Sequence, residues 1–205
     1  GPVFTNSSSA IDLTFAGPVI IKDGTFTDGD SNILTFNSTF DINGGTASSG
    51  TGTVDHDSSV SIDGGTYTVN GSGNFDGQLS FNGGTLDASS ATGLTSTLTD
   101  SNSAIVINTG TFTAPSSGTF SITGGVDVNG GTFANNGTLE ITGAANSIWD
   151  STTTLSVNNF TINKNEGYSF QYGNGTTPVM NVNGLLRLQN GEFNGNTTGT
   201  LYANN

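Results

Sequence analysis

The chain has 205 residues, of which 31 are glycine and 9 % are charged, and its formal net charge is −13. Globular domains carry about 25 % charged residues, and the scarcity of Glu and Lys here excludes a mainly helical fold. Three basic residues cannot form the positive stripe that nucleic acid needs, and no apolar run approaches the ~20 residues of a membrane helix. Cysteine is absent, which excludes disulfides and thiolate metal sites.

One eight-residue phrase recurs along the chain. Two apolar residues flank a residue of any type, an Asn-Gly-Gly-like turn follows, and Thr with an apolar residue closes the phrase. Copies begin at Val19, Phe40, Val60, Leu79, Ile105 and Val126, with a divergent copy at Leu186. Successive copies, measured at the Asn position, are 21, 20, 19, 26 and 21 residues apart. The alternating half predicts a strand with one buried face, and the glycines predict a turn into a further strand.

A fixed period with one motif favours a solenoid over a sandwich, because the strands of a sandwich seldom repeat one another. Stacked coils would align two interior rows. The first is Ile21, Ile42, Ile62, Phe81, Ile107 and Val128, and the second is Phe26, Tyr67, Leu86, Phe112 and Phe133. We therefore predict an all-β, right-handed parallel β-helix with about 20 residues per coil. The 26-residue step predicts an outward loop at residues 88–93.

The chain divides into two parts. Residues 3–143 carry the regular coils, and residues 144–205, which depart from the motif, are expected to form irregular coils of the same solenoid. Gly1 and Pro2 resemble the scar that remains after removal of a purification tag. No capping coil is legible, so we expect the natural protein to be longer.

Two stretches resemble known bacterial surface proteins. Residues 130–143, Gly-Gly-Thr-Phe-Ala-Asn-Asn-Gly-Thr-Leu-Glu-Ile-Thr-Gly, resemble the β-helical passengers of autotransporters. Residues 158–164 and 182–191 resemble repeats of large secreted adhesins of Bacteroidetes-type bacteria. The resemblance is compositional and covers most of the chain. It implies secretion, display at the cell surface and adhesion to surface glycans or host-cell molecules, and it transfers no catalytic residue.

Two polar patterns repeat with the coils. The Asn position predicts a structural ladder of stacked, hydrogen-bonded side chains, formed by Asn43, Asp63, Asn82, Asn108 and Asn129. The outward strand positions predict one rank of Thr25, Thr46, Thr66, Thr85, Thr111 and Thr132. A second rank would comprise Thr27, Ser48, Thr68, Asp87, Thr113 and Ala134. Such ranks resemble ice-binding faces, but Asp87 and Ala134 interrupt them, and Thr is common on exposed strands.

Paired acids are the only candidate metal ligands. Asp28 and Asp30 form one pair, and Asp55 and Asp57 form another around His56. Calcium needs six to eight oxygen ligands, and neither a calcium-binding loop nor a calcium-binding repeat is present. We interpret these acids as solvated turn residues and His56 as an exposed loop residue. No cofactor is expected, and calcium remains open.

The leading functional hypothesis is a structural or adhesive rod segment of a large exported protein, with no enzymatic activity. The first alternative is a carbohydrate-binding module that uses Tyr168 and Tyr172, near Trp149 and Phe170, as a stacking platform. The second is a β-helical glycan-degrading enzyme, which would need paired carboxylates across a groove. Open strand edges at an uncapped end would also allow rods to self-associate.

Overall fold

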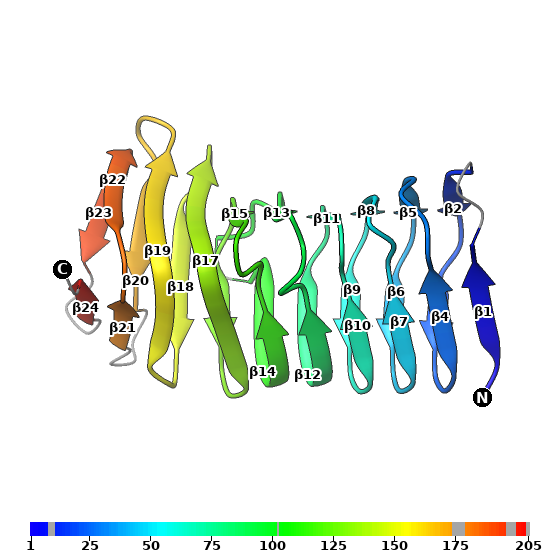
Figure 1. Ribbon diagram of the computed structural model, residues 1–205. Helices are drawn as coiled ribbons and strands as arrows, with labels where there is room; N and C mark the ends of the chain where they lie inside the picture. Colours follow the sequence, from blue (N-terminus) through cyan, green and yellow to red (C-terminus); the bar gives the residue numbers. More distant parts are fainter. Residues whose placement is uncertain (8–10, 102, 174–178, 196–199, 204–205) are drawn as a thin grey trace.

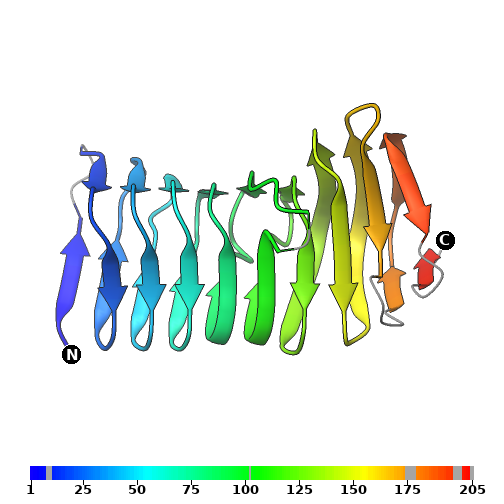
Figure 2. The same ribbon diagram turned by 180° about the vertical axis from the view of Figure 1, so that it is seen from behind.

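The computed structural model confirms the predicted class: the chain is an all-β solenoid of about nine turns with roughly 21 residues per turn. It describes residues 1–7, 11–101, 103–173, 179–195 and 200–203. The turns stack side by side along one axis, with the N-terminus at one end and the C-terminus at the other (Figure 1). The view from behind shows the same row of coils (Figure 2). Among the described residues, no helix has the length and hydrophobicity of a membrane span.

Each coil contributes strands to three faces, and every described pairing between coils is parallel. We call the first face the Thr face, because Thr25, Thr46 and Thr66 align on it in successive coils. The other two are called the second and the third face, in the order in which the chain reaches them. The Thr face contains β1 (Val3–Asn6), β4 (Thr25–Asp28), β7 (Thr46–Ser48), β10 (Thr66–Thr68), parts of β12 (Leu79–Asp87), β14 (Ile105–Thr113), β17 (Thr132–Gly143) and β19 (Leu155–Lys164), then β21 (Val179–Val182) and β24 (Thr200–Ala203). The second face contains β2 (Leu13–Phe15), β5 (Leu34–Phe36), β8 (Thr53–His56), β11 (Ser72–Phe75), β13 (Gly93–Ser96), β15 (Thr119–Ile122), the later parts of β17 and β19, and β22 (Leu186–Asn190). The third face contains β3 (Val19–Ile21), β6 (Phe40–Ile42), β9 (Val60–Ile62), the earlier parts of β12 and β14, β16 (Val126–Val128), β18 (Ser147–Ser151), β20 (Ser169–Tyr172) and β23 (Glu192–Gly195).

The core runs along the axis as rows of like side chains. The register aligns Ile21, Ile42, Ile62, Phe81, Ile107 and Val128, and all six are buried. Side chains of a strand alternate between its two faces, so each coil sends every second residue inward onto its counterpart in the next coil. The predicted interior rows are therefore confirmed.

Glycine sets the turn that joins the third face to the Thr face. Gly45 and Gly65 have positive φ angles of 68° and 70°. A Cβ atom on Gly65 would meet the carbonyl oxygen of Gly45 in the preceding coil. The turn therefore needs glycine for two reasons, namely its backbone conformation and the close contact between coils.

The longest repeat does not place its extra residues where the sequence predicted them. Ala88 and Ala91 lie in the predicted outward loop, yet both are buried. The larger insertion follows β13, where residues 97–104 separate it from β14, whereas only residues 76–78 separate β11 from β12. The prediction was wrong because the small apolar side chains of Ala88 and Ala91 pack inward, although Ser90 between them is exposed.

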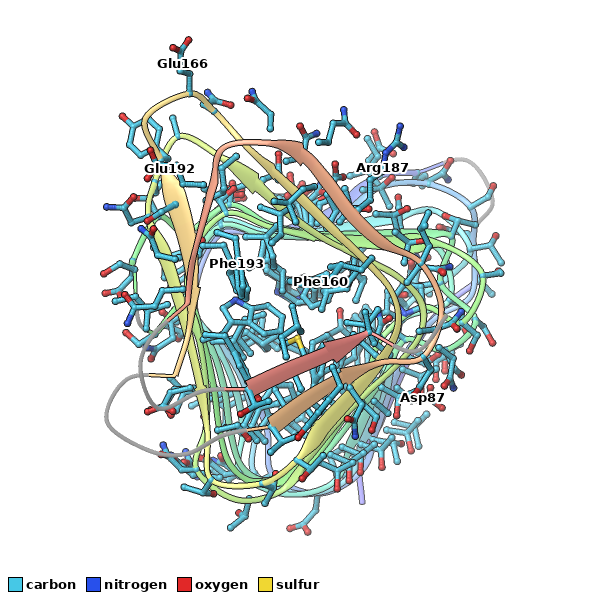
Figure 3. All side chains as sticks on the ribbon, turned by 90° about the vertical axis from the view of Figure 1, so that its left-hand side faces the viewer. Asp87, Phe160, Glu166, Arg187, Glu192 and Phe193 are labelled. Carbon is cyan, nitrogen blue, oxygen red and sulfur yellow. The ribbon has the colours of Figure 1, made fainter. Side chains whose placement is uncertain are left out.

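Residues after Gly143 continue the stack. β18 pairs with β16, and β19 pairs with β17 over most of its length. The irregularity lies in the connections, such as the loop between β19 and β20, whose Glu166 stands out beyond the rim of the coil (Figure 3).

Candidate functional site

The Thr face presents the two outward ranks that the sequence predicted. The register aligns Thr25, Thr46 and Thr66 in neighbouring coils, and continues through Thr85 and Thr111. The hydroxyl of Thr46 donates a hydrogen bond to that of Thr25 at 3.3 Å. Viewed along the axis, side chains from successive coils lie in register beside Asp87 (Figure 3). The face is therefore a repeating array of hydroxyl groups in which a carboxylate interrupts one rank.

The polar ladder forms along the turn beside the Thr face. Asn82 donates its side-chain amide to Asp63 Oδ1 at 2.8 Å, and Asn108 donates to Asn82 Oδ1 at 2.8 Å. Asn129 continues the chain by donating to Asn108 Oδ1 at 3.0 Å. All four side chains are exposed. Asn43 occupies the same turn, but no side-chain bond to Asp63 is found among the described residues, so the ladder joins four coils rather than five.

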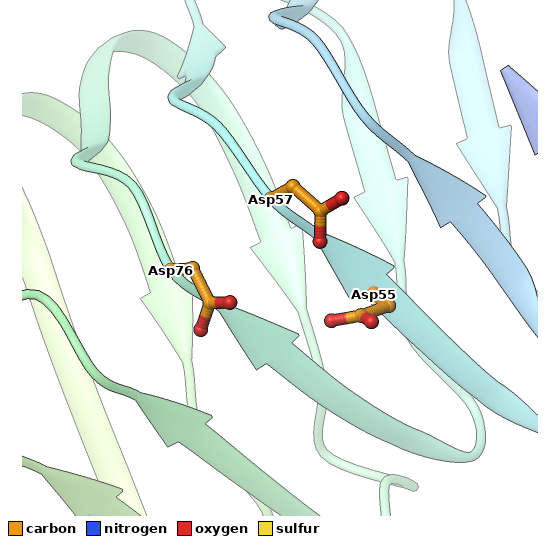
Figure 4. Close-up of side chains that lie close together, drawn as sticks. All are labelled: Asp55, Asp57 and Asp76. Carbon is orange, nitrogen blue, oxygen red and sulfur yellow. The ribbon is translucent and has the colours of Figure 1, made fainter. Parts of the chain in front are cut away.

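Three carboxylates meet on the second face. One carboxylate oxygen each from Asp55, Asp57 and Asp76 lies within 4.8 Å of the other two (Figure 4). Asp76 also accepts a hydrogen bond of 2.6 Å from the hydroxyl of Thr97. Partial burial, and then the negative charges of Asp57 and Asp76, raise the pKa of Asp55. Carboxylates in this arrangement repel one another at neutral pH and offer oxygen ligands of the kind that Ca²⁺ prefers.

The other acidic pair is not solvated, which corrects the sequence-based interpretation. Asp28 is 3 % exposed and Asp30 is 6 % exposed. The side-chain amide of Asn6 donates to both carboxylates, at 2.8 Å and 3.1 Å, and the backbone of Asn32 donates to Asp30 at 3.0 Å. Burial raises the pKa of Asp28, the bond from Asn6 lowers it, and the charge of Asp30 raises it further. These acids hold the first two coils together.

The aromatic platform does not form. Tyr172, predicted as a ligand-binding residue, is 2 % exposed because its position in β20 points inward against Trp149 of β18. Trp149 and Phe170 are fully buried as well. Tyr168 is 36 % exposed and lies in the loop before β20. Of the four aromatic side chains of the predicted platform, one is exposed, where a sugar-stacking surface would need several.

His56 is a core residue, so its prediction as an exposed loop residue was wrong. It is fully buried, and its ring stacks between Phe36 at 4.8 Å and Phe75 at 5.1 Å. Its Nε2 atom shares a hydrogen bond of 2.9 Å with the hydroxyl of Tyr67. Burial lowers the pKa of His56 to about 3, so the imidazole is neutral at physiological pH.

Lys164 is another buried ionisable group, and the sequence did not single it out. Its Nζ atom donates to the carbonyl oxygens of Thr123 and Thr142, at 2.7 Å and 2.6 Å, in the two preceding coils. Burial lowers the pKa of Lys164 to about 8. These contacts bridge three coils, which indicates a structural role.

Sequence reasoning also missed Asp76 and Asn6. Each occupies the same position in its coil as a predicted acid does in a neighbouring coil. Asp76 lies one coil beyond Asp57, and Asn6 pairs in register with Asp28. The 19-residue step between Asp57 and Asp76 was the available signal, because the repeat itself predicts which residues become neighbours.

The chain matches none of the family models, none of the curated proteins and none of the solved structures with which it was compared.

Proposed function

We propose that this chain is a structural and adhesive rod segment of a large exported bacterial cell-surface protein. The observation that carries the proposal is the array of hydroxyl and amide groups that repeats with the coils along the Thr face and its polar ladder. Parallel coils add at intervals of about 4.8 Å, so the array offers equivalent groups at a regular spacing.

The repetition of hydroxyl and amide groups is what would make this surface adhesive. A single Thr or Asn side chain makes a weak contact, but many contacts on one rigid body bind together with high effective concentration. Hydroxyl and amide groups donate and accept hydrogen bonds without charge, which suits neutral glycans of a cell surface. The stacked interior keeps the array straight, since each coil packs like side chains on those of the next.

The binding test varies the density of the protein on a surface and compares substitutions on two faces of the solenoid. Beads that carry the protein at increasing density are incubated with arrayed glycans and with host-cell membranes. We expect retention that rises more steeply than linearly with density. Thr111→Glu, on the Thr face, should reduce retention several-fold, and Thr95→Glu, outward on the second face, should not. Absence of binding at every density, or equal loss in both variants, would refute the adhesive role.

Catalysis is not part of the proposal. Purified protein should release no reducing ends or unsaturated products from a broad panel of polysaccharides. Product release that is lost in Asp76→Asn would instead assign a glycan-degrading activity to the acidic group. Surface display has a separate test. An antibody against the chain should label intact cells of the source organism.

A further inference from the structure

We propose that Asn43 is a site of spontaneous deamidation, at which the backbone nitrogen of Gly44 displaces the side-chain amide and leaves aspartate or isoaspartate. The site is independent of the adhesive role, because it depends on the chemistry of one turn and not on what the Thr face binds. Its basis is a difference in hydrogen bonding between turns of the same sequence.

An asparagine that precedes a glycine contains both partners of this reaction. Gly44 has no side chain, so its nitrogen can approach the side-chain carbonyl carbon of Asn43, Cγ, without steric hindrance. The nitrogen gives its proton to water or hydroxide and bonds to Cγ, while Nδ2 takes up a proton and leaves as ammonia. The five-membered imide then adds one water molecule. Opening at Cγ gives aspartate, and opening at the backbone carbonyl gives isoaspartate, so the reaction consumes water and needs no oxidant.

Three coils present this pair in the same local sequence. Asn-Gly-Gly-Thr begins at Asn43, Asn82 and Asn129, whereas the other Asn-Gly pairs of the chain have a different residue after that glycine. All three asparagine side chains are exposed to water. The local sequence therefore predicts similar deamidation rates at the three positions.

The backbone of the turn is also matched between Asn43 and Asn129. The nitrogens of Asn43 and of the glycine after it donate to one carbonyl oxygen of the preceding coil, at 2.9 Å and 3.3 Å. The nitrogens of Asn129 and its glycine do the same at the same distances. The second glycine has a positive φ in both turns, 68° at Gly45 and 53° at Gly131. The attacking nitrogen is thus held equally in both turns, so a difference in rate must come from the side chains.

The side chains differ because the polar ladder holds two of them and not the third. Asn129 donates its side-chain amide to Asn108 Oδ1 and to Asp127 Oδ2, both at 3.0 Å. Asn82 is held at both its amide and its carbonyl oxygen. Rotation of either side chain toward the following nitrogen breaks these bonds. The side chain of Asn43 makes no hydrogen bond among the described residues, so it turns toward Gly44 without that cost.

The direction of the ladder explains why Asn43 is not held. Each amide of the ladder donates to the side chain at the same position in the preceding coil. For Asn43 that position is Lys22, which follows Ile21, the register partner of Ile42. An ammonium group has donors and no acceptor, so the amide of Asn43 finds no partner there. Asp63, in the following coil, is a carboxylate that accepts hydrogen bonds and offers no donor to the carbonyl oxygen of Asn43.

The test measures the three sites separately in one sample. Folded protein is aged at about pH 8.5, and peptide mapping by mass spectrometry with chromatographic separation of isoaspartate follows each asparagine over time. Asn43 should deamidate about tenfold faster than Asn82 and Asn129, the factor expected when one or two hydrogen bonds must break first. The rate at Asn43 should fall at lower pH, because the attacking nitrogen must lose its proton. In urea the three rates should converge, since the unfolded turns share one sequence.

Variants at Lys22 and Asn108 change the ladder in opposite directions. Lys22→Asn supplies an acceptor in the coil before Asn43 and should slow deamidation of Asn43 to about the rate of Asn129. Lys22→Ala is the matched control, because it removes the same charge without supplying an acceptor, and it should leave Asn43 close to its wild-type rate. Asn108→Ala should accelerate deamidation at Asn82 and Asn129 and leave Asn43 unchanged. Far-UV circular dichroism checks that all variants fold.

The outcomes separate the ladder from other causes. Equal rates at Asn43 and Asn129 in the folded protein, or an intact Asn43 over a time in which the unfolded chain deamidates, would overturn the proposal. Rates that differ to the same degree in urea would also overturn it, since the local sequence would then set them. Equal slowing of Asn43 in Lys22→Ala and Lys22→Asn would trace the effect to charge and would remove the ladder as its cause.

Discussion

Replacing His56 with phenylalanine should remove a large part of the acid sensitivity of this fold. The imidazole is fully buried between Phe36 and Phe75, and burial lowers its pKa from 6.5 to about 3. Between these values the unfolded chain binds a proton that the folded chain does not bind. The free energy of unfolding therefore falls as pH falls through this window, and the full contribution is present above about pH 7.5.

The magnitude follows from the two pKa values. At pH 5 protonation of the unfolded chain should cost the folded state about 2 kcal/mol relative to neutral pH. This figure depends on the unfolded pKa alone, because the folded imidazole stays neutral at pH 5. The raised pKa values of Asp28, Asp41 and Asp55 act in the opposite sense, since their contribution is lost as pH rises. They are common to both proteins and cancel when the two are compared.

Urea unfolding at pH 7.5, 6 and 5 provides the assay. At neutral pH His56→Phe should be less stable by about 1–3 kcal/mol, because it leaves the buried hydroxyl of Tyr67 without its partner. The difference between the two proteins should shrink by about 2 kcal/mol at pH 5. Tyr67→Phe is the control, since it loses the same hydrogen bond but keeps the imidazole and hence the pH dependence. Equal pH dependence in wild type and His56→Phe would refute the reasoning.

Three further predictions concern the interior, the ladder and the acidic group. Trp149→Ala should cost about 3–5 kcal/mol in urea unfolding, because its fully buried ring leaves a cavity. Asn108→Ala should cost about 1 kcal/mol in the same assay, because Asn108 bonds to the coils on both sides of it. Asn43→Ala should cost clearly less, because no side-chain bond from Asn43 to the next rung, Asp63, is found among the described residues. Asp76→Asn should raise the melting temperature at pH 7 but not at pH 3. The expected gain in the free energy of unfolding is about a few tenths of a kcal/mol, because the repulsion of Asp55 is reduced. A wild-type melting temperature that rises with millimolar Ca²⁺, and fails to do so in Asp76→Asn, would show instead that the carboxylates hold the ion.

Much of the fold could be predicted from the sequence because its information is local and repeated. Alternation of apolar and polar residues defines which side of a strand is buried, and glycine marks the turn between faces. With a period near 20 residues, these two signals place Ile42 on Ile62 and Thr46 beside Thr66. The ladder followed from the same period, since equal positions in successive coils become neighbours.

The period predicts neighbours but not the environment of each residue. Asp55 and Asp57 make the segment around His56 look like a solvated loop, but alternation along β8 sends those acids outward and the imidazole inward. Burial of Tyr172 likewise depends on its pairing with Trp149, in a part of the chain where the repeat motif is no longer recognisable in the sequence.

The sequence by itself therefore determined the class of fold, the interior rows and the turn glycines, because each follows from the pattern within one coil and from the period that repeats it. Only the tertiary structure decided which polar groups became buried, where the long coil bulges and which acids meet. Those outcomes depend on contacts between residues about one coil apart, and a one-residue change in register reverses the face on which a side chain lies.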